Sequence, residues 1–229
     1  MSDQPLEAEL VIADKPYEPT ALESINRGEI DVQISTAKRY PRSIVSFKRQ
    51  ALELATADEE TAASCFYSLK RAGKKIEGPS VRLAEIAAYA WGNMRYGARI
   101  IDIQQKHVIA QGFAFDLEKN LASSVEIRRR ITDSEGRRYS DDMITITANA
   151  ACAIAFRQAI FKVLPQALLA DVYKQSRETA AGKALTMEQR RVRIIADMAK
   201  VGASAEQVFK LVDAKGKDDI TIDDILFLK

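Results

Sequence analysis

The hydrophobic period of the sequence changes between residues 98 and 132. In this stretch larger side chains alternate with smaller ones, most clearly from His107 to Phe115, where Val, Ala, Gly and Ala occupy every second position. A repeat of two residues is typical of β-strands, because successive side chains of a strand point to opposite faces of the sheet. Turn-like breaks occur at 104–106, 117–120 and 133–136. The pattern predicts an antiparallel meander of three to four strands joined by short turns.

A long helix is predicted directly after the meander. Beyond Asp141 the apolar residues recur at spacings of three and four, alanine is frequent, and Pro165 ends the pattern. This spacing is helical, and the residue before a proline is disfavoured in a helix. Helical spacing also runs from Ile25 to Lys70, and a second helix is predicted to begin at Gly78-Pro79, with Pro79 in its first turn. The fold class expected is therefore α+β, with helices packed on the meander.

Residues 187–229 show helical spacing in three short segments. Ser204 with Gln207, and Thr221 with Asp224, have the spacing of capping boxes, in which two side chains satisfy free N–H groups at a helix start. We expect a small C-terminal module of three helices. The first residues differ from both parts, because 1–24 hold three prolines and many carboxylates without periodicity. The expected organisation is a flexible acidic arm at 1–24, a core at 25–180 and the helical module at 187–229.

The residue inventory excludes several kinds of chemistry. The chain has one histidine, His107, and two cysteines, Cys65 and Cys152, without a CxxC spacing. Metal sites usually recruit several imidazoles, and a nucleophilic triad needs a base beside its nucleophile. The glycine patterns of nucleotide-binding loops are missing as well. We therefore expect no cofactor, no metal and no catalytic nucleophile, and, since no apolar leader or membrane-length apolar run is evident, a cytoplasmic protein without a membrane partner.

Charge is distributed unevenly along the chain. Residues 1–36 carry 2 basic and 8 acidic side chains, residues 37–140 carry 19 and 12, and residues 141–229 carry 13 and 12. The excess of positive charge therefore lies in the central block. A basic block beside an acidic segment is the asymmetry expected when the block binds a polyanion.

The basic residues of the central block gather at two places. Four cations stand at 70–75, shortly before Gly78-Pro79, where free N–H groups of a helix start also favour phosphate. In the predicted strand around 125–131, Arg128 and Arg130 point away from the apolar positions, so they stand on the solvent face of the sheet. Three tyrosines nearby in sequence are candidate stacking platforms for bases, namely Tyr67, Tyr96 and Tyr139.

The same block resembles the annealing domain of the Rad fifty-two family, and part of it is similar to phage single-strand annealing proteins such as Red-beta and Erf. The resemblance is carried by Arg71, Lys75-Ile76-Glu77-Gly78, Val81, Leu83-Ala84 and Trp91-Gly92-Asn93, and by a basic, alanine-spaced helix with Arg157, Ala159 and Lys162. It implies a curved antiparallel sheet crossed by a long helix, in subunits repeated around a ring or helical filament. Single-stranded DNA would lie in a basic groove of that assembly.

The resemblance implies a function that needs no ATP. Cations would neutralise the phosphates and hold the strand extended, while base edges stay free to pair with a complementary strand in phage-type homologous recombination. The residues predicted to contact phosphate are Arg71, Lys74, Lys75, Arg82, Arg128, Arg130, Arg157 and Lys162. By analogy with Red-beta-like proteins, the C-terminal module would bind the host single-strand-binding protein and a partner exonuclease, and Arg190, Arg191 and Arg193 would receive an acidic peptide tail.

Two other classes of function stay open at this point. The carboxylates Asp102, Asp116 and Glu118 are candidates to hold Mg²⁺ in a nuclease, because hard cations prefer oxygen ligands. A scaffold that binds no nucleic acid is the other class, with the basic strand of one copy against the acidic arm of its neighbour.

Overall fold

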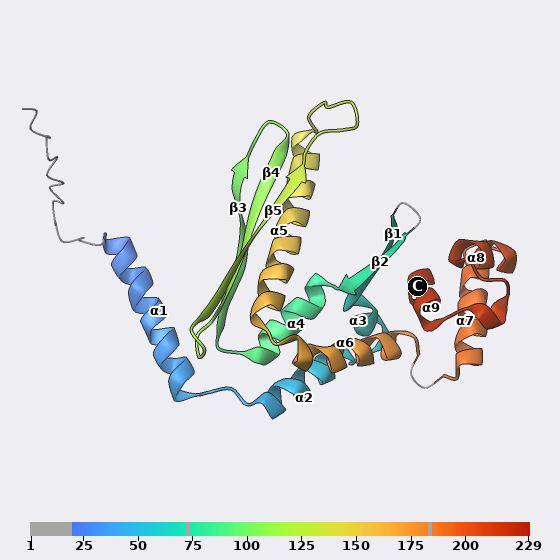
Figure 1. Cartoon of the computed structure of the whole chain (residues 1–229), viewed down its shortest axis with the longest axis horizontal. Helices are drawn as coiled ribbons and strands as arrows, with labels where there is room; N and C mark the ends of the chain where they lie inside the picture. The colour runs from blue at the N-terminus through green and yellow to red at the C-terminus, as the bar shows by residue number, and fades with distance from the viewer. Residues whose placement is uncertain (1–19, 72–73, 183–184) are drawn as a thin grey trace, which may run out of the picture.

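A three-stranded antiparallel sheet and one long helix form the centre of the protein (Figure 1). The structure is a computed structural model that describes residues 20–71, 74–182 and 185–229, leaving out the side chains of 21–23, 71, 74 and 75. The helices are α1 (Ala21–Arg39), α2 (Ile44–Ala55), α3 (Glu59–Ser64), α4 (Val81–Trp91), α5 (Asp141–Val163), α6 (Gln166–Ala180), α7 (Met187–Lys200), α8 (Ala205–Val212), the 3₁₀ turn η1 (Lys217–Asp219) and α9 (Ile222–Leu228). The strands are β1 (Phe66–Arg71), β2 (Lys74–Pro79), β3 (Met94–Ile103), β4 (His107–Asp116) and β5 (Leu121–Arg130).

The predicted meander is confirmed as β3, β4 and β5, in that order across the sheet. Met94 and Leu121 both pair with Asp116, so the β3 start, the β4 end and the β5 start lie at one end of the sheet. A bulge between Ile100 and Asp102 bends β3 near the other end. The strand order follows from short turns, since consecutive strands joined by a few residues pair as antiparallel neighbours.

The predicted long helix is confirmed as α5, which packs along one face of the sheet (Figure 1). Its buried side toward the sheet is rich in alanine, with Ala151 and Ala155 fully buried, which lets the helix backbone approach the strands closely. At the closest point a Cβ on Gly112 would lie 2.2 Å from the carbonyl oxygen of Ala155. Glycine at this position of β4 is therefore required by the packing.

Among the described residues, α5 is also the one helix long and apolar enough to cross a membrane by length and composition. In this structure its alanine side lies on the sheet, with Val108 and Ala110 of β4 in the same buried cluster as Ala151 and Ala155. Of its apolar stretch 28% is buried within the described part of the protein, so this helix departs from the expectation that the chain has no apolar run of membrane length.

A second part of the core lies below the sheet, where α2, α4 and α6 meet the end of α5. The rings of Phe47 and Trp91 are in edge-to-face contact with centres 5.0 Å apart. Ser80 begins α4, since its side chain accepts a hydrogen bond from the backbone N–H of Leu83. Pro79 is the last residue of β2, so the prediction that it opens the first turn of α4 is wrong.

The prediction of helix up to Lys70 is wrong from Phe66 onward. Helix α3 ends at Ser64, and β1 and β2 form an antiparallel hairpin in which Tyr67 lies opposite Gly78 and Leu69 opposite Ile76. A strand of six residues holds only three side chains on each face, which is too few for its period to be separated from the helical spacing that precedes it. The pairing of two separate segments decides the structure here.

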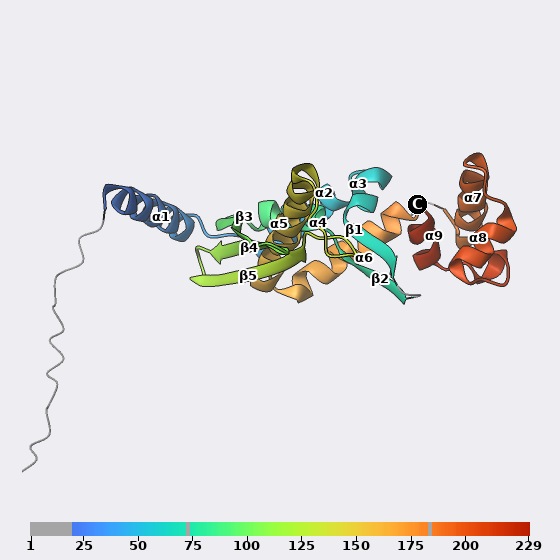
Figure 2. The same cartoon turned by 90° about the horizontal axis from the view of Figure 1, so that it is seen from above.

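Helix α1 extends away from the rest of the molecule in both views (Figures 1 and 2). It begins at Ala21, within the range 1–24 that we expected to be a flexible arm, and the rest of that arm, residues 1–19, lies outside the described residues. Ile25 and Val32 on α1 are exposed. They are apolar side chains that the described part of this chain does not cover.

The three helices predicted near the C-terminus are present as α7, α8 and α9, around a small core of Ile194, Ile220 and Ile225. The capping boxes at Ser204 and Thr221 are both formed. The module contacts the core through Leu226 of α9, which lies in a cluster with Ala62, Ala180 and Ala181.

Candidate nucleic-acid interface

The long helix α5 meets the β1–β2 hairpin at Arg157 and Tyr67. The guanidinium carbon of Arg157 lies 4.8 Å from the centre of the Tyr67 ring, which is cation–π distance. The Tyr67 hydroxyl lies 2.9 Å from the point where a Cβ on Gly78 would be, so the ring lies across the glycine of β2. No carboxylate of a described residue is in ion-pair contact with Arg157. Its positive charge is therefore available to a phosphate group.

The hairpin brings four of the predicted cations to one end of a β-ribbon. Backbone pairing places Lys70 opposite Lys75 and Arg71 opposite Lys74, next to the turn. The side chains of Arg71, Lys74 and Lys75 lie outside the described residues. Lys70 donates a hydrogen bond of 2.9 Å from Nζ to the backbone oxygen of Leu211 in the C-terminal module. The cations thus lie at the turn end of the hairpin, beside the C-terminal module, whereas Arg157 contacts the hairpin three residues before Lys70, at Tyr67.

Lys162 and Arg82, the two other predicted phosphate contacts on the helices, differ from each other in whether their charge is already paired. Lys162 is exposed on the last turn of α5, without a described carboxylate partner. Arg82 on α4 donates from Nη1 to Glu85 Oε2 at 2.5 Å, so its charge is already matched within the helix. Of the two, Lys162 is the better candidate for a phosphate contact.

Arg128 and Arg130 lie on the other side of the sheet from Arg157. They pair with Ile109 and His107 of β4, whose side chains point away from α5, whereas Val108 and Ala110 point toward it. The eight predicted residues therefore do not form one continuous groove in a single copy of the chain. They form one group at the hairpin and α5, and a second group on the open face of the sheet.

The three carboxylates considered for a metal do not come together. Asp102 pairs with Ile109 near one end of β4, and Asp116 is the last residue of β4 at the other end. Seven residues of strand separate these positions, or about 23 Å at ~3.3 Å per residue. Among the described residues no cluster of three or more potential ligands from His, Cys, Asp and Glu occurs.

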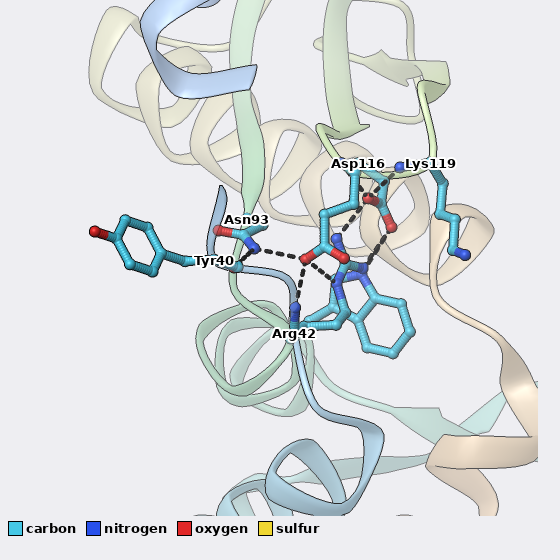
Figure 3. A network of polar contacts seen from close by, with 7 residues as sticks. Tyr40, Arg42, Asn93, Asp116 and Lys119 are labelled. Atoms are coloured by element: carbon cyan, nitrogen blue, oxygen red, sulfur yellow. Dashed lines mark hydrogen bonds and ion pairs between the residues drawn. The ribbon is translucent and has the colours of Figure 1, made fainter. Parts of the chain in front are cut away.

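Asp116 and Glu118 instead hold a buried arginine (Figure 3). Arg42, from the segment between α1 and α2, donates from Nη1 and Nη2 to the two carboxylate oxygens of Asp116, each at 2.5 Å. Its Nε and its backbone N–H each donate to Glu118 Oε1 at 2.9 Å, and its guanidinium lies 4.3 Å from the Trp91 ring centre. Trp91 Nε1 donates to Asp116 at 3.0 Å. The network ties the α1–α2 segment and α4 to the turn between β4 and β5.

The carboxyl group of Glu118 is held in its ionised form by this network. Burial raises the pKa of Glu118, but hydrogen bonds from Asn93 and from Arg42, together with the charge of Arg42, outweigh burial, so its pKa lies below the ordinary value. Asn93 Nδ2 donates to Glu118 at 2.5 Å and to the backbone oxygen of Tyr40 at 2.9 Å (Figure 3). Both carboxylates of the network therefore have structural partners, and a metal would have to displace Arg42.

His107 and Cys152 do not form a nucleophile–base pair. Cys152 packs with the cluster under α5, and burial raises the pKa of its thiol. The side chain of His107 lies on the other face of β4, where Arg128 Nη2 is 3.0 Å from His107 Nδ1. Burial and then the charges of Arg128, Arg130 and Lys106 lower the pKa of His107, so the imidazole is neutral at pH 7. The neutral ring accepts the hydrogen bond from Arg128.

The arginines predicted to receive an acidic tail are occupied within the chain. Arg190 Nε donates to the backbone oxygen of Gly182 at 3.0 Å, and Arg191 Nε donates to that of Ile220 at 2.9 Å. Arg193 Nη2 lies 3.0 Å from a carboxylate oxygen of Glu59 in α3. These contacts hold the module together and attach it to the core. A peptide tail would have to compete with them.

Three residues that were not selected from the sequence stand beside the predicted ones. Arg95 and Arg99 of β3 lie on the same face of the sheet as Arg128 and Arg130, and Phe113 of β4 lies between the two outer strands with 40% of its surface exposed. The signal for the arginines was present, because residues 95 and 99 share the parity of one strand face. Without the strand register it could not be joined to Arg128 and Arg130.

In comparison with known proteins, no protein-family model, no curated sequence and no solved structure matches this chain.

Proposed function

We propose that this protein binds single-stranded DNA and anneals complementary strands without ATP, as a homo-oligomer that acts in phage-type recombination in the cytoplasm of a bacterial host. The observation that carries the proposal is the junction of Arg157 and Tyr67. It joins an arginine without a carboxylate partner to an aromatic ring on a hairpin whose end carries four cations. The resemblance of the hairpin and of the α5 sequence to Rad fifty-two-type annealing proteins supports the same conclusion.

The physical basis is the replacement of counterions. Cations on a protein that contact phosphates release the ions condensed on the strand, and this favours binding in a way that does not depend on sequence. Arg157 on α5 contacts the hairpin at Tyr67, Lys162 is exposed on the last turn of the same helix, and the backbone pairing of the hairpin brings four further cationic residues together at its turn. A strand held by its phosphates leaves its base edges free to pair with a complement, and base pairing then supplies the free energy of annealing.

Replacing Arg157 with alanine is the direct test. We expect the affinity for oligonucleotides of every sequence to fall by about 10- to 150-fold, because a charge-assisted hydrogen bond to phosphate contributes about 1.5–3 kcal/mol. The slope of log affinity against log salt should become shallower by about 0.7 for each phosphate that the variant no longer neutralises. Fluorescence anisotropy with labelled single strands at several salt concentrations measures both quantities.

Arg137 offers a matched control. It is an exposed arginine that is already paired with Asp133 and Glu135, so Arg137→Ala should leave affinity and salt slope unchanged. Arg157→Lys, which keeps the charge but loses the planar contact with Tyr67, should lie between wild type and Arg157→Ala. Equal affinity of the Arg157→Ala and Arg137→Ala variants would remove the assignment of this junction.

Self-association is part of the proposal, since a ring or filament would bring binding surfaces of several copies into one groove. The apolar side chains Ile25 and Val32, exposed on α1, are candidates for burial against a neighbouring copy. Mass photometry of the full chain with and without single-stranded DNA distinguishes a monomer from a closed ring and from a growing filament.

The partners implied by the resemblance stay predictions. A host single-strand-binding protein or an exonuclease would bind the module at 187–229. Because Arg190, Arg191 and Arg193 already have partners within the chain, such a protein would have to contact other side chains or replace those partners. A Mg²⁺-dependent nuclease has less support, because Asp102 lies at the far end of the sheet from Asp116 and Glu118. Incubation of labelled strands with Mg²⁺ separates the two activities, since annealing joins strands without shortening them.

A further inference from the structure

The face of the β3–β4–β5 sheet that points away from α5 is not covered by any described element. The alternation along β4 shows this, because Val108, Ala110 and Ala114 are buried toward α5, while Phe113 between them is 40% exposed. Figure 2 shows α5 along one side of the sheet, and among the described elements only α5 packs extensively on these strands. We call the surface formed by His107, Ile109, Gln111, Phe113 and Phe115 with their paired neighbours on β3 and β5 the open sheet face.

Phe113 presents its ring at the middle of the open sheet face. Its two cross-strand neighbours are small, Gly97 on β3 and Ser124 on β5. The ring lies over Gly97, since a Cβ there would be 2.9 Å from Phe113 Cε1. No bulky neighbour stands directly beside the ring across either strand. The result is an exposed aromatic surface supported by the sheet backbone.

Arginines stand on both outer strands of this face, but only those of β3 are next to the ring, because Arg95 and Arg99 lie two residues either side of Gly97. Arg128 and Arg130 lie four and six residues beyond Ser124 on β5, about 13 and 20 Å along the strand at ~3.3 Å per residue. Arg95 and Arg99 stand on β3, where they pair with Phe115 and Gln111, and Arg128 and Arg130 stand on β5. Neighbouring strands are about 4.8 Å apart, so the two outer strands run roughly 10 Å from each other, with β4 and its aromatic side chains between them.

The hydrogen-bond partners of these four arginines, where the described structure gives one, are neutral. Arg99 donates to Gln111 Oε1 at 3.1 and 3.2 Å, Arg128 contacts His107, and Arg130 donates to the Thr132 hydroxyl at 2.7 Å and to the backbone oxygen of Asp133. The Nη1 atom of Arg95 is buried without a hydrogen-bond partner in the described part of the chain. No described carboxylate forms an ion pair with any of the four.

Lack of an ion pair with a carboxylate is not a general property of the arginines of this chain. Arg42, Arg82, Arg137, Arg177 and Arg193 each form an ion pair with a carboxylate. On the open sheet face the carboxylates Glu126 and Asp102 are present, yet Arg99 bonds to Gln111, and Asp102 accepts from Gln104. Four guanidinium groups without an ion pair, two next to the exposed ring and two farther along β5, leave a surface that is complementary to an extended anion with flat apolar parts.

We propose that the open sheet face binds an unpaired stretch of nucleic acid, with a base stacked on Phe113 and phosphates on the arginine rows of β3 and β5. Stacking on an aromatic ring accepts any base, because every base has a π-face, and arginines beside the ring hold the backbone without reading sequence. In a duplex the faces of the bases are stacked on each other, so the site favours single strands. The inference rests on the proposed function and adds the part of the surface that contacts bases. This surface is on the other side of the sheet from the junction of Arg157 and Tyr67.

The experiment compares three probes on the full-length chain. The first is an oligothymidylate, the second is an abasic sugar-phosphate strand of equal length, and the third is a duplex of that length. Phe113→Leu keeps an apolar side chain of similar bulk but removes the π-face, and Phe113→Tyr restores it. Because Phe113 is partly exposed, neither change should prevent folding, which circular dichroism and thermal unfolding check.

We expect Phe113→Leu to weaken binding of the oligothymidylate by about 5- to 150-fold, the range for removal of one base–aromatic stack. Binding of the abasic strand should not change, and Phe113→Tyr should bind like wild type. Arg99→Ala combined with Arg128→Ala should weaken both the oligothymidylate and the abasic strand, since phosphates are common to both.

The outcomes separate this inference from the proposed function. If the wild-type chain binds the oligothymidylate, Arg157→Ala weakens it and Phe113→Leu does not, the open sheet face is not a base-binding surface while the annealing proposal stands. If Phe113→Leu changes the oligomer mass in mass photometry but no DNA affinity, the face is a contact between copies and the inference is overturned. If the wild-type chain binds none of the probes, both proposals fail.

Discussion

Replacing Arg42 with methionine should lower the free energy of unfolding by about 3–5 kcal/mol, the cost of removing one partner of a buried ion pair. The Arg42 side chain is 7% exposed and that of Asp116 is 2% exposed, so the substitution would leave a carboxylate buried without its cation. Trp91 and two backbone N–H groups would still donate to Asp116, but these neutral donors do not replace a full charge. Denaturant unfolding followed by the fluorescence of Trp91, the single tryptophan, measures the change.

Two further variants show whether burial of the Arg42 ion pair is the cause of the loss of stability. Arg42→Lys keeps the charge but cannot form the two parallel hydrogen bonds, so its stability should lie between wild type and Arg42→Met. Arg82→Met breaks an exposed pair with Glu85 and should cost about 1 kcal/mol or less. A destabilisation by Arg42→Met no larger than that by Arg82→Met would mean that the network of Figure 3 does not stabilise the fold.

The same network makes stability depend on pH. The folded pKa of Glu118 lies below its ordinary value, so its contribution is complete above the ordinary carboxyl range of about 4–5 and is lost as the pH falls through the folded pKa. In Arg42→Met two of the interactions that lower this pKa are missing. The variant should therefore lose less stability than wild type between neutral pH and acid.

Replacing Gly112 with alanine should be the most disruptive change of a single methyl group in the described part of the sheet. The added Cβ would lie 2.2 Å from the backbone oxygen and 2.3 Å from the carbonyl carbon of Ala155. Backbone atoms of a packed helix cannot rotate away, so α5 as a whole must move off β4. Overpacking typically costs about 1–3 kcal/mol and occasionally more, and this contact with rigid backbone belongs at the upper end.

Gly97→Ala is the matched control in the neighbouring strand. Its Cβ would meet the ring of Phe113 at 2.9 Å, but that ring is partly exposed and can turn toward solvent. We expect a decrease in stability below about 1 kcal/mol for Gly97→Ala and a much larger one for Gly112→Ala, measured by denaturant unfolding. Similar decreases in both variants would show that α5 is not seated on β4 as closely as the structure places it. Since α5 carries Arg157, Gly112→Ala should also weaken DNA binding, through displacement of the junction with Tyr67.

The residues of the two surfaces were predictable to different degrees. Arg128, Arg130, Arg157 and Lys162 could be selected as basic residues from spacing and resemblance, and strand parity placed Arg128 and Arg130 on the solvent face of the sheet. The position of Arg157 on the other side of that sheet, against Tyr67, could not be predicted. Side-chain parity within a strand is a local property, whereas the face that α5 covers depends on how Gly112 and the alanines of the helix fit together. The same holds for Phe113, which alternation alone could equally have assigned to the core.

Arg42 shows a different limit. In the sequence it is one arginine near Pro41, and its partners Asp116 and Glu118 are more than seventy residues away. From the sequence those two carboxylates were candidate metal ligands, because acidic residues at strand ends can bind a metal or pair with a basic side chain. Only the approach of the α1–α2 segment to the β4–β5 turn shows that their charge is already balanced.

Local periodicity was sufficient for the α+β class, for the meander and for the long helix that ends before Pro165. It was also sufficient for the three helices near the C-terminus, two of them with their capping boxes. Each of these depends on interactions between residues close in sequence. Such interactions show in the sequence as an apolar repeat of two residues for a strand and of three and four residues for a helix. The hairpin of β1 and β2, the burial of Arg42 and the exposure of one face of the sheet were decided by tertiary packing. They depend on which distant segments meet, and the free energy of those contacts is absent from any short stretch of the chain.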